Sequence, residues 1–142
     1  MKLIKSLTTF YLMRDMVRYL PVWVQLWMGV MMAVLFVAPL FFLDHAAAQW
    51  MSASFMLGGL IMGFLHMKIG ITKLMGIAHL PWLYPLFLIF QDLSLPMISQ
   101  NYTIWLVAAA GVSVLCLVID AIDVIRYLTG NNRQQLAPPA PT

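Results

Sequence analysis

Charge is scarce in this chain of 142 residues, and glutamate is missing altogether. Charged residues make up 9% of the sequence and hydrophobic residues 63%, whereas a soluble domain carries about 25% charged residues. Too few polar side chains remain to cover a water-exposed surface, and there is too much apolar material for a disordered chain. The composition therefore predicts an all-α integral membrane protein with one compact domain, residues 1–130.

Cysteine is almost absent as well, because Cys116 is the only one. A disulfide scaffold is thereby excluded, and a single thiol inside an apolar run is expected to be an inert small hydrophobe. The sequence also lacks G-x-S-x-G, Walker and H-E-x-x-H motifs. We therefore expect no catalytic site, no cofactor, no metal and no nucleic-acid partner.

Long charge-poor runs are what the sequence does contain, and each is near the length of about 20 residues that a helix needs to cross a bilayer. The third run is the weakest, because Pro81, Pro85 and Pro96 interrupt it and it contains Asp92. A re-entrant hairpin is the alternative for this run. The four predicted transmembrane helices are roughly 21–43, 49–68, 80–98 and 102–126.

The basic residues favour four crossings. With four spans, all eight Lys and Arg residues fall on the side of the two termini, and basic loops stay in the cytoplasm. If the third run did not cross, Arg126 and Arg133 would be exported. We therefore expect both termini to be cytoplasmic. The eight residues are Lys2, Lys5, Arg14, Arg18, Lys68, Lys73, Arg126 and Arg133.

Both ends of the chain lie outside the predicted spans. Residues 3–20 resemble an interfacial helix, with a bend or two short pieces, because the apolar face of the first half does not continue past Leu12. A basic flank that only orients the first span is the alternative. Residues 131–142 are rich in proline and predict a disordered cytoplasmic tail.

Small residues at helical spacing predict close helix packing. Gly59 and Gly63 form a G-x-x-x-G motif, and Ser54 and Gly58 form a second small pair. Such pairs let membrane helices approach one another. The fourth span has the same spacing at 109 and 113. The predicted partners are the lipid bilayer and either another membrane protein or a second copy of the chain.

Histidine and methionine suggest two kinds of metal chemistry. His66 and His79 flank one loop and could ligate a haem, since a b-type haem needs two histidines at one depth; hydrogen bonding at the interface is the simpler interpretation. The cluster of Met28, Met31 and Met32 could bind Cu(I). Because no Cys or His is expected at its level, packing is the favoured interpretation.

Carboxylates form the remaining candidate sites. Asp120, Asp123 and Arg126 are neighbours on one helical face and predict a salt-bridge cluster near the cytoplasmic headgroups, with a proton or ion entry site as the alternative. Asp92, beside Gln91, is predicted either to cap the third span or to face a polar pocket, and not to face lipid, where a charge is costly.

Two segments, KLMGIAHLPW at 73–82 and DAIDVIRY at 120–127, resemble parts of small four-helix proteins of the bacterial inner membrane. The resemblance implies this fold and this location and carries no activity. The function we expect is that of an accessory or scaffolding subunit acting through helix–helix contacts. The alternatives are an oligomeric transporter or proton-coupled carrier, and a haem-binding redox subunit.

Overall fold

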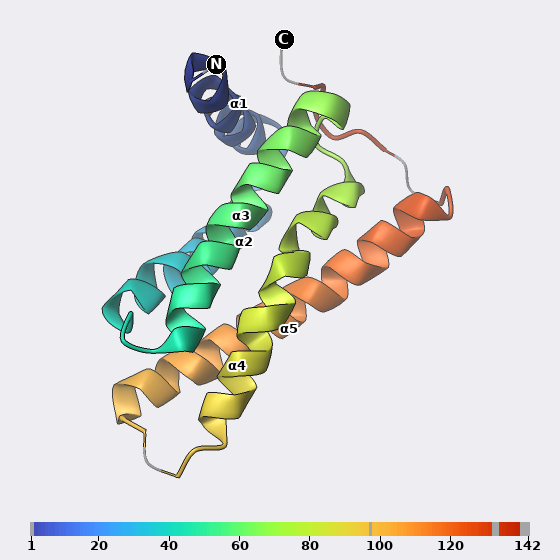
Figure 1. Cartoon of the computed structure of the whole chain (residues 1–142). Helices are drawn as coiled ribbons and strands as arrows, with labels where there is room; N and C mark the ends of the chain where they lie inside the picture. Colours follow the sequence, from blue (N-terminus) through green and yellow to red (C-terminus); the bar gives the residue numbers. More distant parts are fainter. Residues whose placement is uncertain (1, 97, 132–133, 140–142) are drawn as a thin grey trace.

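The computed structural model describes residues 2–96, 98–131 and 134–139, and the regular structure in these ranges is helical (Figure 1). The elements are α1 (Lys2–Tyr19), α2 (Val22–Met32), η1 (Ala33–Val37), η2 (Ala38–Phe41), α3 (Ala46–Ile69), η3 (Lys73–Trp82), α4 (Leu83–Leu93) and α5 (Gln100–Leu128).

Four helical segments are long and apolar enough to cross a membrane: Val22–Phe41, Ala46–Ile69, Lys73–Leu93 and Gln100–Leu128. This fits a multi-pass membrane protein, and the predicted number of helices able to span a membrane is confirmed. The third segment differs from the prediction at both ends. It starts at Lys73 instead of residue 80, because residues expected to form a loop are helical. It ends at Leu93 instead of 98, because the helix stops before Pro96.

The first span changes its helix type near Pro39. In the π-helical turn η1 the amide of Ala38 donates to the carbonyl of Ala33. The same pattern would pair the carbonyl of Val34 with the nitrogen of Pro39, which carries no hydrogen. The indole of Trp105 from α5 donates to this carbonyl instead, at 2.9 Å. Trp105 therefore satisfies a backbone group that the proline leaves unpaired.

The third span begins as an unusually long 3₁₀ helix. η3 runs for ten residues, whereas most 3₁₀ segments have three or four. With three residues per turn, residues three apart are eclipsed, so Lys73, Gly76 and His79 form one straight row. This row faces α5, while Trp82 at its end is buried and stacks on Phe55 of α3.

Small residues bring α3 and η3 together, but they are not Gly59 and Gly63, the G-x-x-x-G pair of the sequence. Ser54 and Gly58 are buried, and a Cβ on Gly58 would lie 2.8 Å from the carbonyl oxygen of Ala78. Around Gly59 and Gly63 an added Cβ would meet no described residue within 4 Å. Gly59 is exposed, because α3 turns its other face towards the bundle. On α5, residues 109 and 113 are fully buried.

α1 is one continuous helix, so the alternative of two short pieces is wrong. Its inward face consists of Leu12 and Asp15, which are 4% and 2% exposed, together with Met16, which packs against the same cluster. Because Asp15 has a buried partner on α3, the second half of the helix needs no turn towards water. The described side chains of α1 begin at Phe10.

The C-terminal segment contacts the loop between α3 and η3. Ala137 is 2% exposed and forms an isolated antiparallel bridge with Ile71, and Gln135 donates to the carbonyl of Ile69. Residues 134–139 therefore differ from the expected disordered tail, since their backbone has partners. The rest of that expectation falls on 132–133 and 140–142, outside the described residues.

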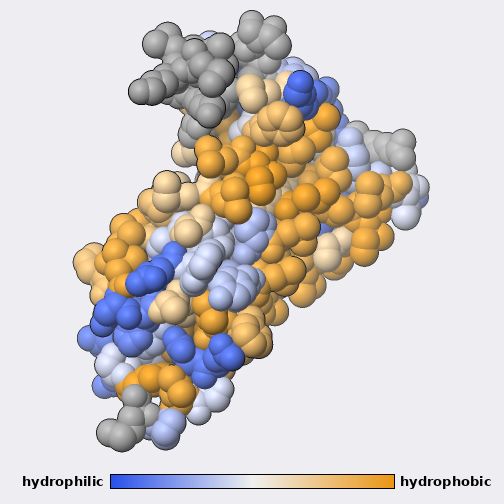
Figure 2. Space-filling model, in the orientation of Figure 1, coloured by the Kyte–Doolittle hydropathy of each residue, from blue (hydrophilic) through white to orange (hydrophobic). Residues whose placement is uncertain are grey.

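Hydrophobic side chains cover a broad part of the face drawn in Figure 2, over α3, α4 and α5, and hydrophilic ones gather towards the end with the α4–α5 connection. Exposed large apolar residues occur on every span, for example Trp23, Leu60, Phe87 and Val118. α1 and residues 134–139 lie at the opposite end, beside each other (Figure 1).

Candidate functional site

Three chemically active side chains from two spans meet beside the row of η3. Nδ1 of His79 lies 2.6 Å from Oδ2 of Asp120. The sulfur of Cys116 lies 3.4 Å from the same carboxylate oxygen and 3.8 Å from the same ring nitrogen. The three donor atoms all lie within 4.8 Å of one another. We call His79, Cys116 and Asp120 the HCD cluster.

Local geometry explains why these residues meet. Cys116 and Asp120 are one helical turn apart on α5, so both face the row of η3. Gly76 lets the two elements approach, because a Cβ there would lie 2.8 Å from the Cβ of Asp120. The side chains of His79 and Asp120 keep 12% and 20% of their surface exposed, whereas Cys116 is 4% exposed. In the HCD cluster the thiol is therefore buried, whereas the carboxylate is partly exposed.

A fourth donor, the thioether of Met31 in α2, borders the HCD cluster, with its sulfur 3.4 Å from that of Cys116. From the sequence, no Cys or His was expected at the level of the methionines, and this expectation is wrong for Met31. Cys116 likewise has polar partners instead of a purely apolar surrounding. The depth of residues on different spans depends on helix offsets that charge-free runs do not reveal.

The HCD cluster is poorly arranged for nucleophilic catalysis. A thiol–imidazole–carboxylate relay places the thiol on one ring nitrogen and the acid on the other. Here the thiol of Cys116 and the carboxylate of Asp120 both approach Nδ1 of His79. The geometry instead points three donor atoms at one small volume.

One turn further along the same interface, Lys73 forms an ion pair with Asp123 at 2.6 Å. The sequence predicted a salt-bridge cluster of Asp120, Asp123 and Arg126, with Lys73 among the basic residues able to neutralise it. The structure places Lys73 on Asp123, whereas Asp120 pairs with His79 and Arg126 is exposed. The row of η3 was missed because residues 68–79 were interpreted as a loop.

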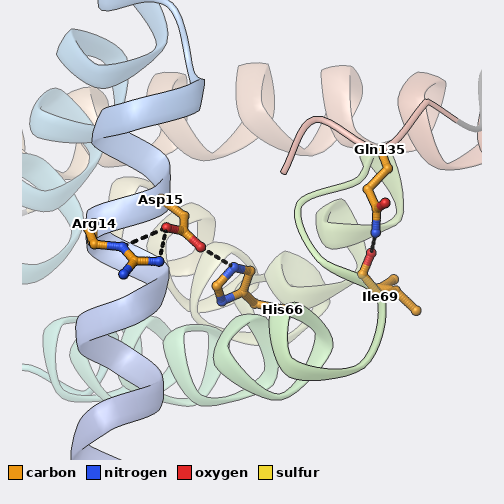
Figure 3. A network of polar contacts seen from close by, with 5 residues as sticks. All are labelled: Arg14, Asp15, His66, Ile69 and Gln135. Carbon is orange, nitrogen blue, oxygen red and sulfur yellow. Dashed lines mark hydrogen bonds and ion pairs between the residues drawn. The ribbon is translucent and has the colours of Figure 1, made fainter. Parts of the chain in front are cut away.

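A second polar cluster joins α1 to the end of α3 (Figure 3). Nε2 of the fully buried His66 lies 3.1 Å from Oδ2 of Asp15, and the guanidinium of Arg14 contacts the other carboxylate oxygen at 2.7 Å. Nδ1 of His66 has no hydrogen-bond partner among the described residues. A carboxylate next to two basic residues on α1 was the available sequence signal, but it does not identify the partner.

The two histidines proposed as haem ligands thus belong to different polar clusters. His66 is directed at Asp15 and His79 at Asp120. A haem would need both rings to face one cofactor. The positions of these residues give the haem hypothesis no support.

The predicted polar residue of the third span, Asp92, lies near the end of α4 and accepts a hydrogen bond from the hydroxyl of Tyr102 at 2.5 Å. Tyr102 is fully buried, and the ring of His45 stacks on it at 3.8 Å between centroids. Gln91 is exposed, and Ser94 donates to the carbonyl of Phe90. Asp92 therefore points towards α5, and Ser94 does not join it.

Comparison of the chain with models of protein families, with curated proteins and with solved structures finds no match. The class that the fold defines is an all-helical chain with four helices able to span a membrane.

Proposed function

We propose that the chain is an accessory or scaffolding subunit of the bacterial inner membrane, with both termini cytoplasmic, which acts through helix–helix contacts with a second copy or a larger complex. α1 lies along the cytoplasmic interface. The eight Lys and Arg residues support the orientation, because four spans place them all on one side.

The observation that carries the proposal is the outer face of α3. Gly59 is exposed, and space for a Cβ is open around it. Glycine is costly inside a helix, by about 1 kcal/mol relative to alanine, and packing within the chain uses Gly58 instead. In a membrane, a glycine on an outer face allows a second helix to approach closely. The exposed Met56 and Leu60 flank this position.

The carrier alternative has less support. It relied on Asp92, Asp120 and Asp123 as exchangeable carboxylates. Each of them has a partner within hydrogen-bonding distance, namely Tyr102, His79 and Lys73.

Native electrophoresis of the chain in mild detergent, with and without its native membrane partners, tests the proposal. We expect wild type to migrate as an assembly larger than one chain, and Gly59→Leu to weaken that assembly. Gly111→Leu on α5 is the matched control, because its surroundings are equally open. A lone wild-type monomer under all mild conditions, or equal effects of the two variants, would contradict the proposed contact.

The orientation has a separate test. A reporter fused after Asn131, beyond the end of α5, should show cytoplasmic activity. A periplasmic signal would contradict the four-crossing topology, whatever the electrophoresis shows.

A further inference from the structure

We propose that the HCD cluster is a binding site for a divalent transition metal of the zinc type. The site is independent of the outer face of α3, so it can exist whether or not the chain assembles with others. His79, Cys116 and Asp120 supply one nitrogen, one sulfur and one oxygen donor, all of them types that Zn²⁺ accepts.

The distances suit a metal. Zinc binds nitrogen and oxygen at about 2.0–2.2 Å and sulfur at about 2.3 Å in a tetrahedral arrangement, which places neighbouring donors about 3.3–3.6 Å apart. The sulfur of Cys116 lies 3.4 Å from the oxygen of Asp120 and 3.8 Å from the nitrogen of His79. The pair of His79 and Asp120, at 2.6 Å, must widen when the ion replaces the shared proton. The pair of Cys116 and His79, at 3.8 Å, must shorten by about 0.2 Å.

Charge balance favours a divalent ion over Cu(I). One thiolate, one carboxylate and one neutral imidazole carry two negative charges, so Zn²⁺ makes the site neutral. Neutrality matters because an uncompensated charge is expensive inside a membrane span. Cu(I) with Cys116, His79 and the thioether of Met31 would leave the Asp120 carboxylate unbalanced. Binding releases the thiol proton of Cys116 to water, and the proton between His79 and Asp120 moves to Nε2 of His79, so that Nδ1 is free to bind the ion.

The exposure of the HCD cluster and the contacts around its side chains also suit a metal site. The partly exposed side chains of His79 and Asp120 provide an entry on one side. The ring of Trp82 lies 4.2 Å from that of His79 and limits its rotation. Such supporting contacts orient ligands, and losing one typically lowers affinity about 10–100-fold.

The test uses the full chain, purified in detergent, stripped with a chelator and then titrated with Zn²⁺ against a competing chelator. We expect one Zn²⁺ per chain for wild type, and at least about a tenfold weaker affinity for Cys116→Ser, Asp120→Asn and His79→Gln. Asp123→Asn is the matched control, because it lies on the same face of α5 but pairs with Lys73, and it should retain wild-type affinity.

Cobalt provides a readout that does not depend on how well any variant folds. Co²⁺ added to wild type should give a thiolate-to-metal absorption band, and Zn²⁺ should displace it. Absence of the band, or no Zn²⁺ retained against the chelator, would overturn the proposal. Equal losses in Asp123→Asn and Asp120→Asn would also overturn it. If Met31→Leu removes binding and the chain prefers Cu(I), the divalent assignment is wrong.

Discussion

The carbonyl oxygen of Ala78 lies 2.8 Å from the point that a Cβ on Gly58 would occupy. The contact is between one helix and the backbone of another, so neither side can yield by rotating a side chain. It fixes α3 against η3 at the level of the HCD cluster, which begins one residue further along with His79.

Gly58→Ala should therefore destabilise the fold. Overpacking of this kind costs about 1–3 kcal/mol, and unfolding in a denaturing-detergent titration would measure it. The neighbouring Gly59→Ala is the control: its Cβ meets nothing within 4 Å, so we expect a change within about 1 kcal/mol, towards higher stability. Equal losses in the two variants would contradict the close contact.

The Asp15–His66 pair should hold α1 on the bundle. Asp15→Ala leaves a buried ring nitrogen of His66 without its partner, which costs about 1–3 kcal/mol. We expect faster tryptic cleavage after Arg18, because α1 detaches more often. Asp44→Ala is the control, since the Asp44 side chain is 82% exposed. An unchanged cleavage rate for Asp15→Ala would show that α1 is held by apolar contacts alone.

The Tyr102 hydroxyl should stabilise the join between α4 and α5. Tyr102→Phe keeps the ring under His45 and removes only the hydrogen bond to Asp92, worth about 1.5–3 kcal/mol if the carboxylate is charged. A double-mutant cycle with Asp92→Ala, followed by unfolding in detergent, isolates the pairwise energy. If the effects of Tyr102→Phe and Asp92→Ala on the free energy of unfolding simply add, the hydrogen bond contributes no stability, because water replaces the hydroxyl at no cost.

Gly70 should be required for residues 134–139 to stay in contact with the loop between α3 and η3. Its φ of +72° is unfavourable for any other residue, and a Cβ would lie 2.1 Å from the carbonyl oxygen of Ala137. Gly70→Ala should therefore release residues 134–139 and speed hydrogen exchange of the Ile71 amide, which donates to that carbonyl at 3.0 Å. Truncation after Asn131 should give the same faster hydrogen exchange of the Ile71 amide. Gly111→Ala is the control and should leave that exchange at the wild-type rate.

The spans could be predicted because a membrane helix is defined by a continuous property of the chain, its lack of charge. The HCD cluster could not, because it depends on how far two spans are offset along the bundle. His79 was placed before the third span, so nothing linked it to Cys116 in the fourth. The non-apolar positions of its helical start, Lys73, Gly76 and His79, recur every third residue, a period that matches neither an α-helix nor a strand.

Small-residue motifs illustrate a different limit. Gly58 and Gly59 are adjacent and chemically identical, yet one touches a neighbouring backbone and the other faces outward. A helix turns by about 100° per residue, so the motif indicates close packing without indicating which of two neighbouring pairs is used. Only the position of η3 decides between them.

The 3₁₀ geometry of η3 also sets the length and rotation of the third span. A 3₁₀ helix rises about 2.0 Å per residue and an α-helix about 1.5 Å, so the ten residues of η3 are about 5 Å longer than they would be as α-helix. Rewinding them would shorten the span by that amount. It would also rotate His79 by about 120° relative to Lys73, because six residues make two full 3₁₀ turns but only about one and two-thirds α-turns. In the 3₁₀ conformation His79 faces Asp120 and Lys73 faces Asp123 at the same time, so the two pairs together favour the longer form of this span.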